Sequence, residues 1–359
     1  MREEYYYYWL GRIRGIGLRT IEEWIKEGYT PEQFYRGDSV FLRSIRGMTE
    51  KMKEQILDPV WKEQTKKEWE LCQKEEIRYY SYFFKDYPVY LRKIYQPPRE
   101  LFARGPLPED IKGSIAIVGA RDCSFYGRDM ARWFGARLAR AGMWVVSGMA
   151  LGIDGWAHRG ALEAGGRTCA VLGSGIKVCY PERNRALYKQ LWQQGSIVSE
   201  WPVYTKAQPG FFPLRNRIIS GLASGVLVVE AREKSGSLIT ANEALDQGKD
   251  VFVVPGRIGD RLSQGCNRLI CAGAIPVLCP EDILNYYGIE EKEIMRNFTK
   301  EEEKIWQELG SYPVSVQALC RTTGIHLERV YKILLKWKKN QWIQEVAQGY
   351  FIKEGELET

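Results

Sequence analysis

The feature that most constrains the fold is a series of short apolar runs between residues 114 and 278, none of which alternates with polar residues. Continuous apolar runs are typical of strands buried on both faces, as in parallel sheets covered by helices. Helical stretches such as Gly127 to Ala141 and Thr240 to Gln247 separate the runs, which predicts an extended, Rossmann-like, doubly wound and mostly parallel α/β sheet. The predicted strands are Ser114 to Val118, Trp144 to Ser147, Thr168 to Leu172, Ile197 to Glu200, Val226 to Glu230, Val251 to Val254 and Ile275 to Leu278.

The region before this sheet is helical and charged. It contains two similar phrases, Ile13-Arg14-Gly15-Ile16-Gly17 and Ile45-Arg46-Gly47-Met48-Thr49, each opening a helix-like run. Glycine at a helix start leaves backbone N–H groups that can hold a phosphate, which favours a helix-hairpin-helix or SAM-like bundle. The same phrases also fit tight turns that let two helices pack, so both interpretations stay open.

The region after the sheet predicts a winged helix. Thr299 and Glu302 have the spacing of a capping box, and the run from His326 to Trp337 has helical periodicity. A hairpin pattern follows, from Trp342 to Ile352. We therefore expect three domains, at residues 1–73, 74–289 and 297–355.

Composition excludes some classes of protein and favours others weakly. The chain has 52 Lys and Arg against 45 Asp and Glu, a formal charge of +7 that slightly favours an anionic partner. No apolar run approaches the roughly 18 residues of a membrane span, and Glu3 and Glu4 stand where a signal peptide would be basic. We expect a cytoplasmic protein with no membrane partner. Eight cysteines without a Cys-x-x-Cys pair and only two histidines predict no metal site.

Three glycine-rich phrases follow predicted strands. In parallel sheets such loops meet at one edge, so their N–H groups should converge on an anion there. None is a strict dinucleotide fingerprint or a Walker A motif, and we predict no cofactor. The candidate DNA-binding residues in these phrases are Gly119, Arg121, Ser147, Gly148, Gly173, Ser174 and Gly175.

Two further clusters carry chemistry suited to nucleic acid. Residues 211–221 combine aromatic rings with two guanidinium groups, which suits single-stranded nucleic acid, although a helix with core phenylalanines and solvated arginines fits as well. Residues 235–241 offer hydroxyl groups and bare amides at a helix start. The candidates here are Phe212, Arg215, Asn216 and Arg217 in the first cluster and Ser235, Gly236, Ser237 and Thr240 in the second.

Several residues admit a catalytic interpretation beside a structural one. Asp154 and His158 are four apart and could form an acid–base pair, but a capping aspartate and an internally bonded histidine are favoured. Glu200 and Glu230 end predicted strands without a recognisable partner, which favours structural roles. Arg121 lies on the loop after the first strand, where a cation points into the ligand crevice, and a salt bridge is its alternative.

Taken together and in order, the motifs resemble the DNA-processing protein A family, also called Smf. The resemblance covers roughly 200 residues, too many independent motifs for chance. It rests on Tyr87-Pro88, Pro97-Pro98, Val118-Gly119-Ala120-Arg121, Ser147-Gly148, Gly152-Ile153-Asp154, Ala157-His158, Leu172-Gly173-Ser174-Gly175, Tyr180-Pro181, Phe212-Pro213, Arg215-Asn216-Arg217, Ser235-Gly236-Ser237, Thr240-Ala241, Val254-Pro255-Gly256 and Gly265-Cys266-Asn267.

The resemblance implies a non-catalytic protein that protects single-stranded DNA, forms a homodimer and loads the RecA recombinase during natural transformation. Lys177 departs from the family pattern, which commonly has an acidic residue there; it either adds a phosphate contact or is solvated. Two other functions stay open: a Rossmann-like nucleotide phosphoribohydrolase, and a winged-helix transcription regulator whose sheet senses a nucleotide.

Overall fold

The computed structural model describes residues 2–289, 298–310, 312–339 and 342–353 of the 359-residue chain. The chain forms two compact units, Met1–Ile289 and Glu290–Thr359. Asn297 and the last two residues of the predicted winged-helix region lie outside the described residues. No helix of the described residues is long and apolar enough to cross a membrane.

The first unit is built on a nine-stranded sheet with the order β1-β2-β6-β5-β4-β3-β7-β8-β9. All pairs from β6 to β9 are parallel, whereas β1 pairs with β2, and β2 with β6, in antiparallel register. The predicted α/β class and its seven strands are confirmed. The strands are β1 (Arg78–Ser81), β2 (Glu100–Arg104), β3 (Ser114–Val118), β4 (Trp144–Ser147), β5 (Thr168–Val171), β6 (Ser196–Ser199), β7 (Gly225–Val228), β8 (Asp250–Val253) and β9 (Ile275–Pro276).

The strand order places a topological switch point between β3 and β7. From β3 the chain builds outward through β4, β5 and β6, and then returns to lay β7 on the other side of β3. The connections therefore diverge above this pair of strands, and a crevice opens at their carboxyl ends. Ligands of open α/β sheets bind at such a crevice.

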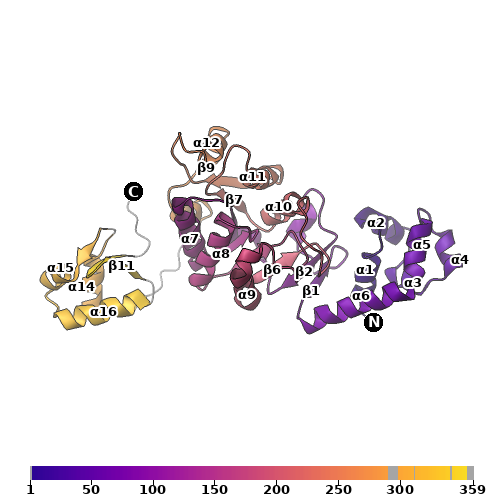
Figure 1. The fold of residues 1–359 in the computed structure, drawn as a ribbon, viewed down its shortest axis with the longest axis horizontal. Coiled ribbons are helices and arrows are strands. Elements are labelled where there is room, and N and C mark those ends of the chain that lie inside the picture. The colour runs from indigo at the N-terminus through magenta and orange to yellow at the C-terminus, as the bar shows by residue number, and fades with distance from the viewer. Residues whose placement is uncertain (1, 290–297, 311, 340–341, 354–359) are drawn as a thin grey trace. The chain divides into compact units, whose positions relative to one another are not determined.

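Helices cover both faces of the sheet (Figure 1). Ile115 and Ile117 of β3 are buried against α7 and α8, whereas Ala116 and Val118 are buried against α10 and α11. This alternation is the period of two of a strand, and it buries both faces. The helices are α7 (Phe125–Arg140), α8 (Ile153–Glu163), α9 (Arg185–Gln194), α10 (Phe211–Gly221), α11 (Gly236–Asp246), α12 (Gln264–Cys271) and α13 (Pro280–Tyr286), with three short 3-10 turns at Val89–Lys93, Ile111–Gly113 and Glu182–Asn184.

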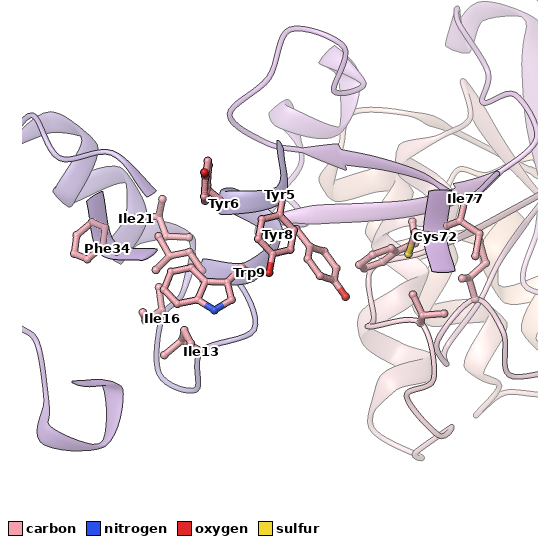
Figure 2. Packing of buried hydrophobic residues seen from close by; sticks show 14 of the residues in the cluster. Tyr5, Tyr6, Tyr8, Trp9, Ile13, Ile16, Ile21, Phe34, Cys72 and Ile77 are labelled. Atoms are coloured by element: carbon pink, nitrogen blue, oxygen red, sulfur yellow. The ribbon is translucent and has the colours of Figure 1, made fainter. Parts of the chain in front are cut away.

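The N-terminal helices pack around an aromatic cluster that continues into the sheet. Tyr5, Tyr8 and Trp9 of the first helix are buried in a cluster that includes Cys72 (Figure 2). The same cluster contains Phe102 of β2. A buried ion pair between Arg12 and Glu100 also joins this region to β2. These helices are α1 (Glu3–Leu10), α2 (Leu18–Lys26), α3 (Pro31–Arg36), α4 (Ser39–Ser44), α5 (Glu50–Leu57) and α6 (Pro59–Lys74).

The two glycine phrases of this region form the same turn. The N–H of Ile16 donates to the carbonyl of Ile13, and the N–H of Met48 donates to that of Ile45. Gly15 and Gly47, at φ +90° and +79°, occupy the third position of each turn. Only glycine adopts that conformation without strain, so the repeat seen in the sequence reflects one backbone geometry used twice.

The second unit has the element order of a winged helix. Its three-stranded antiparallel sheet has the order β10-β12-β11. Thr299 and Glu302 form the predicted capping box, and Val330, Leu334 and Trp337 are buried in the core. The elements are α14 (Lys300–Glu308), β10 (Val314–Ser315), α15 (Val316–Thr323), α16 (Leu327–Lys339), β11 (Ile343–Ala347) and β12 (Tyr350–Lys353).

Candidate nucleic-acid interface

A cavity of about 580 Å³ lies at the switch point, where the loops after β3 and β7 meet the starts of α10 and α11. Nine of the sixteen predicted DNA-binding residues line it. They are Gly119, Arg121, Phe212, Arg215, Asn216, Ser235, Gly236, Ser237 and Thr240.

Arg121 and two aromatic rings form one wall of the cavity. The guanidinium carbon of Arg121 lies 5.5 Å from the centre of the Phe212 ring, and the ring of Tyr180 lies 5.3 Å from that of Phe212. Arg121 and Tyr180 are both exposed to solvent. A Cβ atom on Gly173 would lie 2.6 Å from Phe212, so the glycine makes room for this ring. The wall offers π-faces and one open cation to a ligand.

The loop after β3 is fixed from both sides. The N–H of Ala120 donates to the carbonyl of Glu230 at 2.7 Å, and the N–H of Ile153 donates to the carbonyl of Ala120. A Cβ on Gly119 would lie 2.6 Å from Ile153. The glycine therefore allows α8 to pack against the loop that presents Arg121.

The loop after β4 binds an anion that belongs to the chain itself. The N–H of Gly148 donates to Oδ2 of Asp154 at 3.1 Å, and Ala150 adds a second backbone hydrogen bond to this carboxyl. Burial raises the pKa of Asp154, and the charge of Arg215 opposes that shift. The N–H groups of this loop therefore hold the side chain of Asp154. Asp154 does not cap α8 as expected from the sequence, because the N-cap of α8 is Gly152, which has no side-chain cap hydrogen bond.

Arg215 is buried beneath the cavity and bonded to the chain. Its guanidinium donates to the carbonyl of Gly148 at 2.7 Å and also to the carbonyl of Val171. The residue is only 4% exposed, and burial lowers the pKa of its guanidinium to about 10. Arg215 therefore joins the ends of β4 and β5, and its charge lies under the cavity floor.

The start of α11 forms the opposite wall. The hydroxyl of Ser235 accepts the N–H of Ser237 and lies 2.8 Å from the hydroxyl of Ser237. Asn216 donates to the carbonyl of Gly236 at 3.4 Å, which ties α10 to this turn. Burial leaves Thr240 only 2% exposed.

Two cations beside this wall escaped the sequence analysis. Arg232 and Lys234 both line the cavity, and Arg232 lies 3.6 Å from Asp122. They follow β7 as Arg121 follows β3, so their position at a strand's carboxyl end was the signal available in the sequence. With Arg121 and Arg215 they give the lining four cations against the two carboxylates Asp122 and Asp154.

The remaining predicted residues lie outside the cavity lining. Arg217 forms an ion pair with Glu200, and both side chains are nearly buried. Lys177 lies 3.0 Å from Glu75 and sits over the ring of Trp192, so it faces α6 and α9. Ser147, Gly148, Gly173, Ser174 and Gly175 support the loops behind the cavity.

The candidate catalytic groups have structural contacts. His158 is fully buried, its Nδ1 lies 2.6 Å from the hydroxyl of Thr168, and burial lowers its pKa to about 3. Glu230 accepts the N–H of Ser124 at 2.9 Å and also its hydroxyl, and so fixes the start of α7. Among the described residues, no group of three or more His, Cys, Asp or Glu side chains could hold a metal ion.

Fold and cavity together define an α/β protein with a positively charged, aromatic crevice at the switch point of a Rossmann-like sheet. Residues 78–288 match the family model described as DNA recombination-mediator protein A. The chain belongs to this family.

The chain is also similar to individual relatives. It is 44% identical over 200 residues to the DNA processing protein DprA of Bacillus subtilis, covering 55% of this chain and 67% of that protein. The X-ray structure of DprA from Streptococcus pneumoniae matches with a TM-score of 0.65 at 33% identity, over 79% of this chain and 97% of that one. A structure of DNA processing protein A from Helicobacter pylori, described by its unique single-stranded DNA binding mode, matches with a TM-score of 0.54 at 28% identity, over 59% of this chain and 96% of that one.

Proposed function

We propose that this chain binds single-stranded DNA in the switch-point cavity and delivers it to the RecA recombinase. The supporting observation is the wall in which the open cation of Arg121 lies over the ring of Phe212, beside Tyr180. Stacking faces next to cations suit a strand whose bases are unpaired, and they read no base sequence. The H. pylori relative, described by its single-stranded DNA binding mode, supports the same ligand.

The wall of Arg121 also makes the proposal testable. Arg121→Ala should weaken single-stranded binding and lower the log–log salt slope by about 0.7, the contribution of one phosphate contact to single strands. The measurement is fluorescence anisotropy with labelled oligothymidylate over a range of salt concentrations. Arg167→Ala is the matched control, because Arg167 is also exposed but precedes β5 at the opposite edge of the sheet. An unchanged slope in Arg121→Ala would contradict the proposal, as would equal affinity for blunt duplex DNA.

The proposal extends to the role implied by recombination mediation. The chain would protect incoming single strands, form a homodimer and load RecA during natural transformation, in the cytoplasm, without a catalytic reaction of its own. RecA loading is measured as faster RecA-dependent ATP hydrolysis on oligonucleotides when the chain is added. Light scattering at micromolar concentration measures the dimer. Release of ribose phosphate from a nucleoside monophosphate, abolished by Glu230→Gln, would instead support a phosphoribohydrolase.

A further inference from the structure

The surface beside the cavity carries a second set of rings and cations that the proposed site does not use. Phe125 and Arg128 lie on α7, and Trp156 and Arg159 lie on α8. The guanidinium carbon of Arg128 lies 5.0 Å from the ring centre of Phe125 and 5.6 Å from that of Trp156. Arg159 lies 4.7 Å from the ring centre of Trp156. These four groups alternate ring and cation, and we name them the α7/α8 ladder.

Stability does not explain the end of this ladder. Phe125 is 79% exposed, and the neighbouring Tyr126 is 53% exposed, both in the first turn of α7. An aromatic side chain stabilises a fold by burying its large apolar surface; Phe125 buries little of it, and Tyr126 buries about half. Arg128 pairs with Asp129 at 2.8 Å on the surface, where such a pair contributes little and a phosphate can replace the carboxylate.

Both ends of the ladder connect to the cavity. At the first end, Phe125 directly follows the loop whose Arg121 and Asp122 line the cavity. At the second end, Arg159 donates to Asn184 at 3.3 Å, and Asn184 donates to the carbonyl of Ala150 in the cavity wall. The ladder therefore starts next to the loop that lines the cavity, and its members lie in the first turn of α7 and the first two turns of α8.

We propose that the α7/α8 ladder is a second segment of the binding surface for single-stranded DNA, which takes the nucleotides that leave the cavity. This rests on the proposed function, because the ladder extends the same strand. Alternating rings and cations match a strand that presents bases and phosphates in turn. The alternation also argues against a protein partner, whose docking surface would gather its apolar side chains at one centre.

The test is a length series of labelled oligothymidylates from about 4 to about 24 nucleotides, the range of known single-strand site sizes and somewhat beyond. Phe125→Ala should leave the affinity for the shortest strands unchanged and weaken the longest by about fivefold or more, the loss of one stacked base. Phe125→Trp should restore the affinity, whereas Phe125→Leu should not. Tyr95→Ala is the matched control, because Tyr95 is 78% exposed and follows Ile94, which packs at the far end of α10.

The outcomes separate the two proposals. Weakening by Arg121→Ala at every length, together with wild-type affinity of Phe125→Ala for the longest strand, would overturn the ladder and leave the cavity in place. Wild-type affinity in both variants would overturn both proposals. Circular dichroism checks that the exposed substitution leaves the fold intact.

Discussion

Arg215 could either contact DNA directly or hold the proposed binding site together, and an experiment can distinguish these two roles. Its sequence context, an arginine two residues from another beside two phenylalanines, suggests a DNA contact. In the structure Arg215 is 4% exposed, and its guanidinium donates to the carbonyls of Gly148 and Val171. We therefore expect Arg215→Met, which removes the charge and keeps much of the side-chain length, to destabilise the first unit.

The magnitude follows from the two hydrogen bonds. A hydrogen bond from a charged donor contributes about 1.5–3 kcal/mol, so two of them give about 3–6 kcal/mol. The carbonyls at the ends of β4 and β5 would lose their partner, and Asp154 would keep a buried charge without the cation that lowers its pKa. Adding Asp154→Asn should recover part of the loss, and a double-mutant cycle measures that coupling.

The assay is urea unfolding of the full chain at pH 7, followed by circular dichroism. Arg121→Met is the control, because its exposed side chain should change the free energy of unfolding by no more than about 0.5 kcal/mol. If the free energy of unfolding of Arg215→Met lies within about 1 kcal/mol of the wild-type value and only the DNA affinity is lost, then Arg215 contacts DNA and the structural role assigned to it is refuted.

Two further predictions concern pH and the second unit. The pKa of His158 is about 3 in the folded chain and near 6.5 in the unfolded chain. The free energy of unfolding should therefore be unaffected by His158 above pH 6.5 and fall by about 1.4 kcal/mol per pH unit between pH 6 and 4. Urea titrations of His158→Gln should lack this slope. A chain ended after Glu293 should keep its affinity for single-stranded DNA within about tenfold. The reason is that Lys332 and Lys336 of α16 already pair with Glu328 and Glu302. Loss of binding by a folded truncation would move the main site to the winged helix.

The sheet could be predicted because its strands are buried on both faces and therefore read as apolar runs. The strands β1 and β2 were not predicted, because each begins with a charged residue. Arg78 begins β1 and Glu100 begins β2, and a charged residue at the start of a short run obscures the apolar pattern of a strand. In the fold, the charge of Glu100 is paired with that of Arg12. Arg12 precedes Glu100 by 88 positions in the chain, so no local sequence pattern contains both residues.

The two arginines of α10 lie in different surroundings for a geometric reason. Arg215 and Arg217 are two residues apart on α10, and two helical steps of about 100° each turn them to nearly opposite faces. One guanidinium therefore lies under the cavity and the other meets Glu200. Their spacing alone could have shown that the two arginines cannot both face one bound DNA strand. Which of them faces the cavity depends on how α10 packs.

The anion already held by the loop after β4 limits which groups of the proposed site could contact a DNA backbone. Since Asp154 takes the N–H groups of Gly148 and Ala150, a phosphate cannot use them without displacing a buried carboxylate. In the proposed site this loop therefore gives the DNA backbone no free N–H group, and the side-chain cations of the lining gain weight, of which Arg121 is exposed and Arg215 is not. The glycines of these loops serve close packing, as Gly119 does for Ile153 and Gly173 for Phe212. A glycine-rich strand end therefore identifies the edge of the sheet where a ligand binds, whereas the side chains around it identify the ligand.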